Sequence, residues 1–346
     1  MKQRRRPSTS LLLAGTLLTI GSAGAAVQTA PAPVPATQQL RQEAKSLEPM
    51  FRATLVQRFL AATADLPSIS PRNAMRDPAT RRYYTPAEAE TLPEQTRKGL
   101  EKVDLDEEYY YNTRYGTPLA YSRPLEILAE AGFDTVEGKK LLDFGYGGIG
   151  HLRLLASLGA EVVGVEVDPL LKILYGQPGD QGTIKGRHGK DGTLTLVDGQ
   201  FPADDAVNRA VGDGYDLVIS KNVLKNGYIH PAEPVDPRRL VHLGVDEETF
   251  VRRLFTILKP GGRALIYNLC PAPAPAGKPY IPWADGRSPF SETLFKTSGF
   301  TVVAFDKDDT SAARLMGRAL GWHEGESAMD LEKDLFATYT LVEKPR

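Results

Sequence analysis

From Lys139 onward, short apolar runs alternate with amphipathic segments, and this alternation constrains the fold more than any other feature of the sequence. Helical periodicity is clear at 149–159, 169–176 and 245–258. Alternating strands and helices predict a doubly wound, mostly parallel α/β sheet, here of seven strands, with its ligand beyond the carboxyl ends of the strands. The expected strands are KLLDF (140–144), EVVGVEV (161–167), TLTLV (193–197), DLVIS (216–220), ALIYNL (264–269), FTVVAF (300–305) and FATYTLVE (336–343).

Residues 143–150 read DFGYGGIG and connect the first expected strand to the first expected helix. Such a turn needs positive φ angles or a close approach of backbone to ligand, and glycine supplies both at low cost. Counted from Gly145 through Gly147 and Gly150, the stretch fits G-x-G-x-x-G, the dinucleotide fingerprint. Counted from Asp143, it instead reads as an acid followed by G-x-G, so the glycines alone leave the ligand open.

Two acidic residues narrow the choice of ligand. Glu166 ends the second expected strand, where a carboxylate can accept hydrogen bonds from both ribose hydroxyls of a nucleoside, whether that nucleoside belongs to NAD or to another cofactor. Asp143 separates the two templates, because a carboxylate beside the turn repels phosphate and attracts an ammonium group. The pair favours a nucleoside that carries an ammonium group.

Residues 141–169, LLDFGYGGIGHLRLLASLGAEVVGVEVDP, resemble the first βαβ unit of class I S-adenosylmethionine-dependent methyltransferases. The resemblance continues in order through LVDGQFP (196–202), YDLVISKNVL (215–224), ILKPGGRALI (257–266) and the last two strands, the final one antiparallel. It departs from the family at Ile149, where glycine is common. It implies a Rossmann-like methyltransferase fold with S-adenosyl-L-methionine as cofactor. The cofactor-binding positions it implies are Tyr115, Asp143, Gly145, Gly147, Gly148, Glu166, Asp198, Gly199 and Ser220.

The catalytic step is less visible in the sequence. Methyl transfer from a sulfonium is an in-line displacement that depends mainly on alignment, and a base is needed only when the acceptor must lose a proton. Asn222 and His230 follow the fourth strand and are weak candidates for that role. His151 is expected on the surface of the first helix, and Cys270 as a packing residue at a strand end. The loop 271–283 is expected to shape the acceptor pocket.

The N-terminus has the layout of a bacterial signal peptide at residues 1–26. MKQRRRPSTS is cationic, residues 11–26 are apolar but shorter than the ~20 residues of a membrane-spanning helix, and Ala23-Gly24-Ala25 offers a cleavage site. This predicts an exported or periplasmic protein, with an uncleaved anchor facing the cytoplasm as the alternative. An Ala/Pro-rich linker is expected at 27–37, an N-terminal helical cap at 38–136, and the methyltransferase-like domain at 137–346.

The composition of the chain mainly indicates which classes of partner the protein binds. The 346 residues include 42 basic and 43 acidic ones, which argues against a nucleic-acid partner and favours a small-molecule or protein acceptor. The single cysteine allows no internal disulfide, and no histidine spacing predicts a metal site. The oligomeric state is open. Two alternatives remain: an NAD(P)-dependent oxidoreductase, and an exported, non-catalytic methyltransferase-like binding protein, since S-adenosylmethionine is made in the cytosol.

Overall fold

The computed structural model describes residues 34–346 apart from 188, 326 and 327, and residues 34–346 form one compact unit. The expected signal peptide, and the expected linker up to residue 33, lie outside the described residues. Helix α1 (Ala36–Leu47) begins within the last part of that linker.

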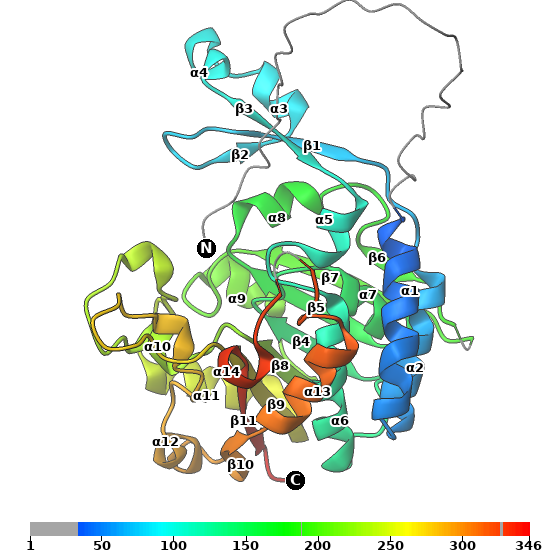
Figure 1. The fold of residues 1–346 in the computed structure, drawn as a ribbon, viewed down its shortest axis with the longest axis vertical. Helices are drawn as coiled ribbons and strands as arrows, with labels where there is room; N and C mark the ends of the chain where they lie inside the picture. The colour runs from blue at the N-terminus through cyan, green and yellow to red at the C-terminus, as the bar shows by residue number, and fades with distance from the viewer. Residues whose placement is uncertain (1–33, 188, 326–327) are drawn as a thin grey trace, which may run out of the picture. The chain divides into compact units, whose positions relative to one another are not determined.

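A central sheet of eight strands carries the fold, in the order β10-β11-β9-β8-β4-β5-β7-β6 (Figure 1). All seven expected strands are confirmed. The number seven was wrong, because a further short strand, β6, pairs antiparallel with β7 at the edge. The strands are β4 (Lys140–Phe144), β5 (Glu161–Glu166), β6 (Gly182–Ile184), β7 (Gly192–Asp198), β8 (Tyr215–Lys221), β9 (Leu258–Cys270), β10 (Thr301–Asp308) and β11 (Phe336–Glu343).

The direction of the strands defines where a ligand can bind. Strands β7, β5, β4, β8 and β9 are parallel, and β11 runs antiparallel between β9 and β10. Strand β4 lies in the middle of the sheet. Strands β5 and β7 lie in that order on one side of it, and β8 and β9 lie in that order on the other side. The carboxyl ends of β4 and β8 therefore border the crevice at the switch in strand order, which is where doubly wound sheets bind ligands.

Helices cover both faces of the sheet, as the alternating pattern requires. Apolar side chains of one face pack with α1, α2 (Thr54–Ala61), α6 (Ser122–Glu130), α7 (Gly150–Ser157), α8 (Pro169–Leu174) and α13 (Thr310–Ala319). Those of the other face pack with α9 (Asp205–Val211), α11 (Glu247–Ile257) and α12 (Glu292–Thr297). Period-two alternation along β4 sends Leu141 and Asp143 to the first face and Leu142 to the second.

The N-terminal extension is only partly helical, so the expectation of a helical cap was wrong over part of its length. The first part is helical, as α1 and α2, and Pro49, which lacks an N–H donor, lies in a 3₁₀ turn between these two helices. A three-stranded antiparallel sheet follows, formed by β1 (Arg72–Arg76), β2 (Tyr83–Tyr84) and β3 (Glu101–Leu105), with the short helices α3 (Pro86–Glu90) and α4 (Glu94–Lys98). This small sheet contacts α8 (Figure 1).

A buried ion pair joins the small sheet to the loop between α8 and β6. Both guanidinium nitrogens of Arg72 on β1 donate to the carboxylate of Asp180, at 2.7 and 2.9 Å, and the hydroxyl of Tyr110 donates to the same carboxylate at 2.9 Å. Tyr110 belongs to α5 (Glu107–Asn112), which leads into residues 113–121. The extension is thereby tied down just before the segment that reaches the glycine turn.

Candidate functional site

The turn after β4 has the backbone that its glycines predict. Gly145 has φ +75° and Gly147 has φ +59°, which is the left-handed region that side chains disfavour. A Cβ on Gly145 would lie 2.5 Å from Cγ2 of Val223, so the turn also packs closely on the exit of β8. Gly148 differs, because its φ is not positive and a Cβ there would make only an ordinary 3.5 Å contact.

Gly150 begins α7 and has a packing role. A Cβ at this position would lie 2.9 Å from the ring of Pro118, which belongs to the segment packed on the helix start. The residue that completes the dinucleotide pattern is therefore small because another segment of the chain packs against it.

Glu166 lies beside the turn, at the end of β5. Its Oε2 accepts the N–H of Gly147 at 3.1 Å, and its Oε1 accepts the N–H groups of Val167 at 2.8 Å and Asp168 at 3.3 Å. Burial raises the pKa of Glu166 above the usual value, while the hydrogen bonds from Val167 and Gly147 oppose that rise. A carboxylate held this firmly is preorganised to accept further hydrogen bonds on its remaining lone pairs.

Asp198 and Gly199 adjoin Glu166 on the next strand. Glu166 and Asp198 are directly paired in the parallel ladder between β5 and β7, and the N–H of Gly199 donates to the carbonyl of Glu166 at 2.8 Å. Gly199 has φ +135°, and Asp198 is half-exposed with Lys172 as its nearest cation, at 3.9 Å. The structure thus brings three of the sequence-predicted residues together at one edge.

Residues 113–117 cross the glycine turn. The hydroxyl of Thr113, at φ +42°, donates to the carbonyl of Gly147 at 2.9 Å, and the Tyr115 side chain lies 3.0 Å from where a Gly147 Cβ would be. The Tyr115 hydroxyl donates to Asp168 at 2.9 Å, and Arg114 pairs with the same carboxylate at 2.5 Å. Tyr115 is 44% exposed, so it covers the turn from the solvent side.

Asp143 is buried beneath the turn. Its Oδ2 accepts hydrogen bonds from the Tyr121 hydroxyl at 2.8 Å and from His151 Nε2 at 2.5 Å. The expectation that His151 lies on the surface was wrong, because this ring is 2% exposed and stacks on Tyr121 at a centroid distance of 3.6 Å. His151 lies on the face of α7 that packs against residues 118–121. The hydrophobic periodicity of α7 alone does not predict this contact.

Further polar side chains of the site lie at the carboxyl end of β8. Ser220 is buried, and its hydroxyl donates to the carbonyl of Phe144 at 3.1 Å, which joins β8 to β4. Asn222 has φ +66°, and its side-chain oxygen accepts the N–H of Leu269 at 2.7 Å, so this amide joins β8 to β9. Lys221 lies between these two residues, and its side chain is buried. The sequence analysis did not predict a role for this side chain, although a lysine at the end of an apolar strand is an unusual residue that could have indicated one.

His230 is the second weak catalytic candidate. It follows α10 (Asn226–Ile229), and its Nε2 lies 2.9 Å from Oε1 of Glu247. Both side chains are more than one-third exposed, and exposed ion pairs contribute little to stability. Cys270, as expected, is a buried residue at the end of β9.

Replacing His230 with asparagine should therefore leave the free energy of unfolding and the affinity for nucleosides nearly unchanged. We expect a change in stability of about 0.5 kcal/mol or less, as for most exposed substitutions. Urea denaturation and calorimetric titration measure the two quantities. A large loss of nucleoside affinity in this variant would place His230 in the binding site.

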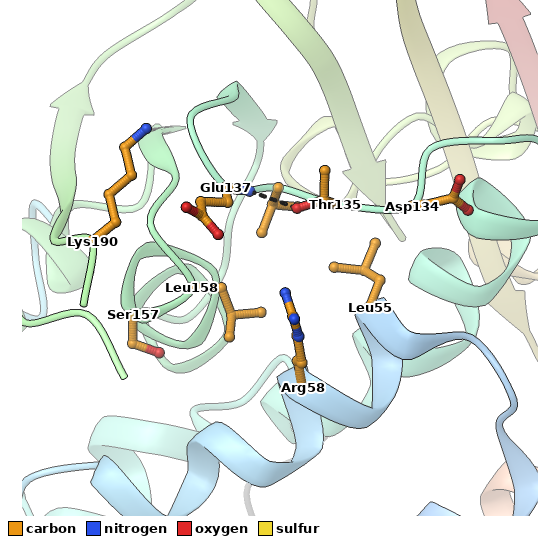
Figure 2. Close-up of a pocket in the computed structure, with 9 residues that line it drawn as sticks. Leu55, Arg58, Asp134, Thr135, Glu137, Ser157, Leu158 and Lys190 are labelled. Carbon is orange, nitrogen blue, oxygen red and sulfur yellow. Dashed lines mark hydrogen bonds between the residues drawn. The ribbon is translucent and has the colours of Figure 1, made fainter. Parts of the chain in front are cut away.

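A separate shallow hollow, partly open to solvent, lies near the amino ends of the parallel strands (Figure 2). Arg58 of α2 projects toward residues 134–137, which precede β4, while Ser157 and Leu158 come from the end of α7. This hollow is at the amino ends of the parallel strands and does not include the glycine turn. Its charged residues are all exposed: Arg58, Asp134, Glu137 and Lys190.

Two further properties of the described residues bear on function. Within residues 34–346, apart from the three omitted positions, no cluster of three or more His, Cys, Asp or Glu side chains could hold a metal ion. In the same part of the chain, no helix combines the length and apolarity needed to cross a membrane.

No protein-family model and no curated protein matches the chain. Solved structures do. An S-adenosylmethionine-dependent methyltransferase of Mesorhizobium loti matches at 16% identity over 65% of this chain and 97% of its own, with a TM-score of 0.36. A candidate sarcosine dimethylglycine methyltransferase of Galdieria sulphuraria matches at 15% over 67% and 88%, with a TM-score of 0.38. A phosphoethanolamine N-methyltransferase of Haemonchus contortus, bound to S-adenosylhomocysteine, matches at 15% over 71% and 63%, with a TM-score of 0.36.

Proposed function

We propose that the chain is an S-adenosylmethionine-dependent methyltransferase of class EC 2.1.1. One observation carries the proposal: the carboxylate of Asp143 is buried beside the glycine turn, where it would repel the pyrophosphate of a dinucleotide and attract an ammonium group. Glu166 accepts the N–H of Gly147, and Asp143 lies buried below the turn. In dinucleotide-binding folds the turn and the following helix N-terminus instead direct free N–H groups at phosphate.

The strand order also favours a methyltransferase over a dinucleotide-binding oxidoreductase. The dinucleotide-binding order continues from the fifth strand to a sixth, whereas here the antiparallel strand β11 lies between β9 and β10. The antiparallel last strand is what the resemblance to methyltransferases implied. In this proposal Glu166 accepts the ribose hydroxyls, Asp198 meets the adenine amino group, and the ammonium end of the cofactor lies toward Asp143.

The residues around the crevice suit methyl transfer by positioning. An in-line displacement needs the sulfonium and the acceptor held in line and water excluded. The strap of residues 113–117 covers the turn from above, and Tyr115 offers a ring to a sulfonium, with a cation–π attraction of about 0.5–2 kcal/mol. We propose a small-molecule or protein acceptor, entering near the exit of β8 and the 271–283 loop.

Calorimetric titration of the full chain with S-adenosylmethionine, S-adenosylhomocysteine and NAD tests this function. We expect saturable binding of the two methionine nucleosides and none of NAD. Binding of NAD alone would contradict the proposal and support an oxidoreductase. If the folded protein binds none of the three, the non-catalytic alternative gains support.

We also propose that residues 1–26 direct export, with a retained anchor facing the cytoplasm as the competing arrangement. Export separates the enzyme from cytosolic S-adenosylmethionine, so the protein would have to leave with its cofactor bound. Fusing residues 1–40 to a reporter active only outside the cytosol tests the topology. Reporter activity supports export, and a silent but stable fusion contradicts it.

A further inference from the structure

The strap of residues 113–117 lies directly on the glycine turn. The Tyr115 side chain lies 3.0 Å from where a Gly147 Cβ would be, so the strap and the turn are in van der Waals contact. The N–H of the same glycine donates to Glu166 at 3.1 Å. A nucleoside that lies on the turn and reaches Glu166 with its ribose has to enter between the turn and the strap. The strap must therefore move away from the turn whenever such a ligand binds or leaves.

Asp168 holds the tip of the strap. Its Oδ2 accepts hydrogen bonds from the Tyr115 hydroxyl at 2.9 Å and from Arg114 at 2.5 Å. Arg114 also lies over the Tyr115 ring, 4.9 Å from its centre, and donates to the Tyr115 hydroxyl at 2.6 Å. The other oxygen of Asp168, Oδ1, accepts the N–H of Leu170 at 3.0 Å and so caps α8. One oxygen thus fixes the carboxylate to its own helix, while the other binds the strap.

Two unusual backbone positions flank Arg114 and Tyr115. Thr113 has φ +42°, a left-handed angle that is strained for a side chain branched at Cβ. Gly116 has φ +96°, and a Cβ there would have no described atom within 4 Å. Loop opening and closing are absorbed at a few such positions, and the open space beside Gly116 leaves room for the change. The tip of the strap can therefore move while its ends stay attached.

The extension is held by a second, buried ion pair, and the two pairs differ in how easily they break. The side chains of Arg72 and Asp180 are 9% and 2% exposed, whereas that of Arg114 is 60% exposed. Breaking a buried pair leaves an uncompensated charge, which is costly. An exposed pair contributes little to stability and is screened by salt. The strap can thus open while the rest of the extension stays in place.

We propose that Arg114, Tyr115 and Asp168 form a latch that controls how fast the nucleoside cofactor enters and leaves. Arg114 and Asp168 are positioning residues: they hold Tyr115 over the turn and do not themselves contact the cofactor. The inference rests on the proposed function, because it concerns access to that same site.

Kinetic measurement by surface plasmon resonance, with S-adenosylhomocysteine and the immobilised full chain, tests the latch. Arg114→Gln and Asp168→Asn should each raise both the association and the dissociation rate constants by roughly 3- to 10-fold, as expected for one partly exposed charged pair. The dissociation constant should change by about 2-fold or less, because the latch holds the strap both before and after binding. Asparagine is itself a good N-cap residue, so α8 stays capped in the Asp168 variant.

Arg187→Gln is the matched control. Arg187 lies in the turn between β6 and β7 and pairs with Asp65 at 2.5 Å, so it has the same chemistry away from the strap. Its loss should change neither rate constant by more than about 2-fold. Faster dissociation with unchanged association in the latch variants would overturn the proposal, because the side chains would then only stabilise the bound complex. Wild-type rates in both latch variants would overturn it as well.

Hydrogen exchange of the full chain tests the strap without any cofactor. The N–H of Tyr115 donates to Oγ1 of Thr113 at 3.1 Å, so its exchange reports on the strap itself. Arg114→Gln should speed exchange in residues 113–117 by about 3- to 10-fold and leave exchange in α7 unchanged. If the wild-type protein binds no nucleoside, the proposed function fails, and this measurement still decides whether the latch exists. Exchange in the strap that is equally fast in wild type and variant would refute the latch.

Discussion

Replacing Glu166 with alanine should weaken binding of S-adenosylhomocysteine by roughly 10²- to 10⁴-fold, because two hydrogen bonds to a charged acceptor contribute about 1.5–3 kcal/mol each. The substitution also releases the N–H groups of Gly147, Val167 and Asp168, so the turn loses the anchor that shapes it. Calorimetric titration measures the affinity.

Glu161→Ala is the control for this substitution. Glu161 begins the same strand, β5, but its side chain is 56% exposed and forms a surface ion pair with Lys140, at 3.3 Å. Its removal should change the affinity by about 2-fold or less, as for a surface ion pair. Similar losses in the two variants would show that the effect of Glu166 is not a contact with the nucleoside.

The pKa of Glu166 adds a pH dependence. Its pKa is raised by burial, and only the ionised carboxylate accepts from both ribose hydroxyls. Affinity should therefore be constant well above that raised pKa and should fall as the pH drops through it, while Glu166→Ala should show no such fall. For stability the sign is opposite: a raised carboxyl pKa makes folding less favourable as the pH rises through the interval between the unfolded and folded values.

Replacing Gly145 with alanine should lower the free energy of unfolding by about 2–5 kcal/mol. About 1–2 kcal/mol comes from the left-handed backbone, and about 1–3 kcal/mol from the contact with Val223. Its φ is +75°, and the new Cβ would lie 2.5 Å from Cγ2 of Val223. The loss should appear in urea denaturation, accompanied by weaker nucleoside binding in the fraction that folds.

Gly148→Ala is the matched substitution in the same turn. Its φ is ordinary, and the new Cβ would lie 3.5 Å from Thr113. Stability should change by about 0.5 kcal/mol or less in either direction. Equal losses at both positions would mean that the turn tolerates no side chain anywhere, so the backbone of Gly145 would not be special.

Periodicity predicts elements that are buried along a regular face. The runs at 140–144, 161–167 and 216–220 could be assigned because each has an apolar centre and is bounded by turn residues, as central parallel strands are. Strands β1 and β3, RNAMR and EKVDL, could not be assigned, because they are largely polar and form by pairing with each other across the intervening residues 77–100.

The candidate site likewise has residues whose positions the sequence predicts and residues whose contacts it does not predict. Gly145, Gly147, Glu166 and Asp198 were predictable because their positions relative to strand ends fix where they lie in a doubly wound sheet. The partners of Asp143 were not predictable. Tyr121 comes from the extension, and His151 reaches Asp143 from the first turn of α7; neither residue has a spacing in the sequence that predicts this contact.

The central claim is that this crevice holds S-adenosylmethionine, and a crystal structure of the full chain grown with S-adenosylhomocysteine tests it most directly. The account predicts the ribose on Glu166, the adenine beside Asp198, and the ammonium end of the homocysteine toward Asp143, under the strap of residues 113–117. A nucleoside bound elsewhere, for example in the hollow beside Arg58 near the amino ends of the parallel strands, or a ribose without contact to Glu166, would contradict it.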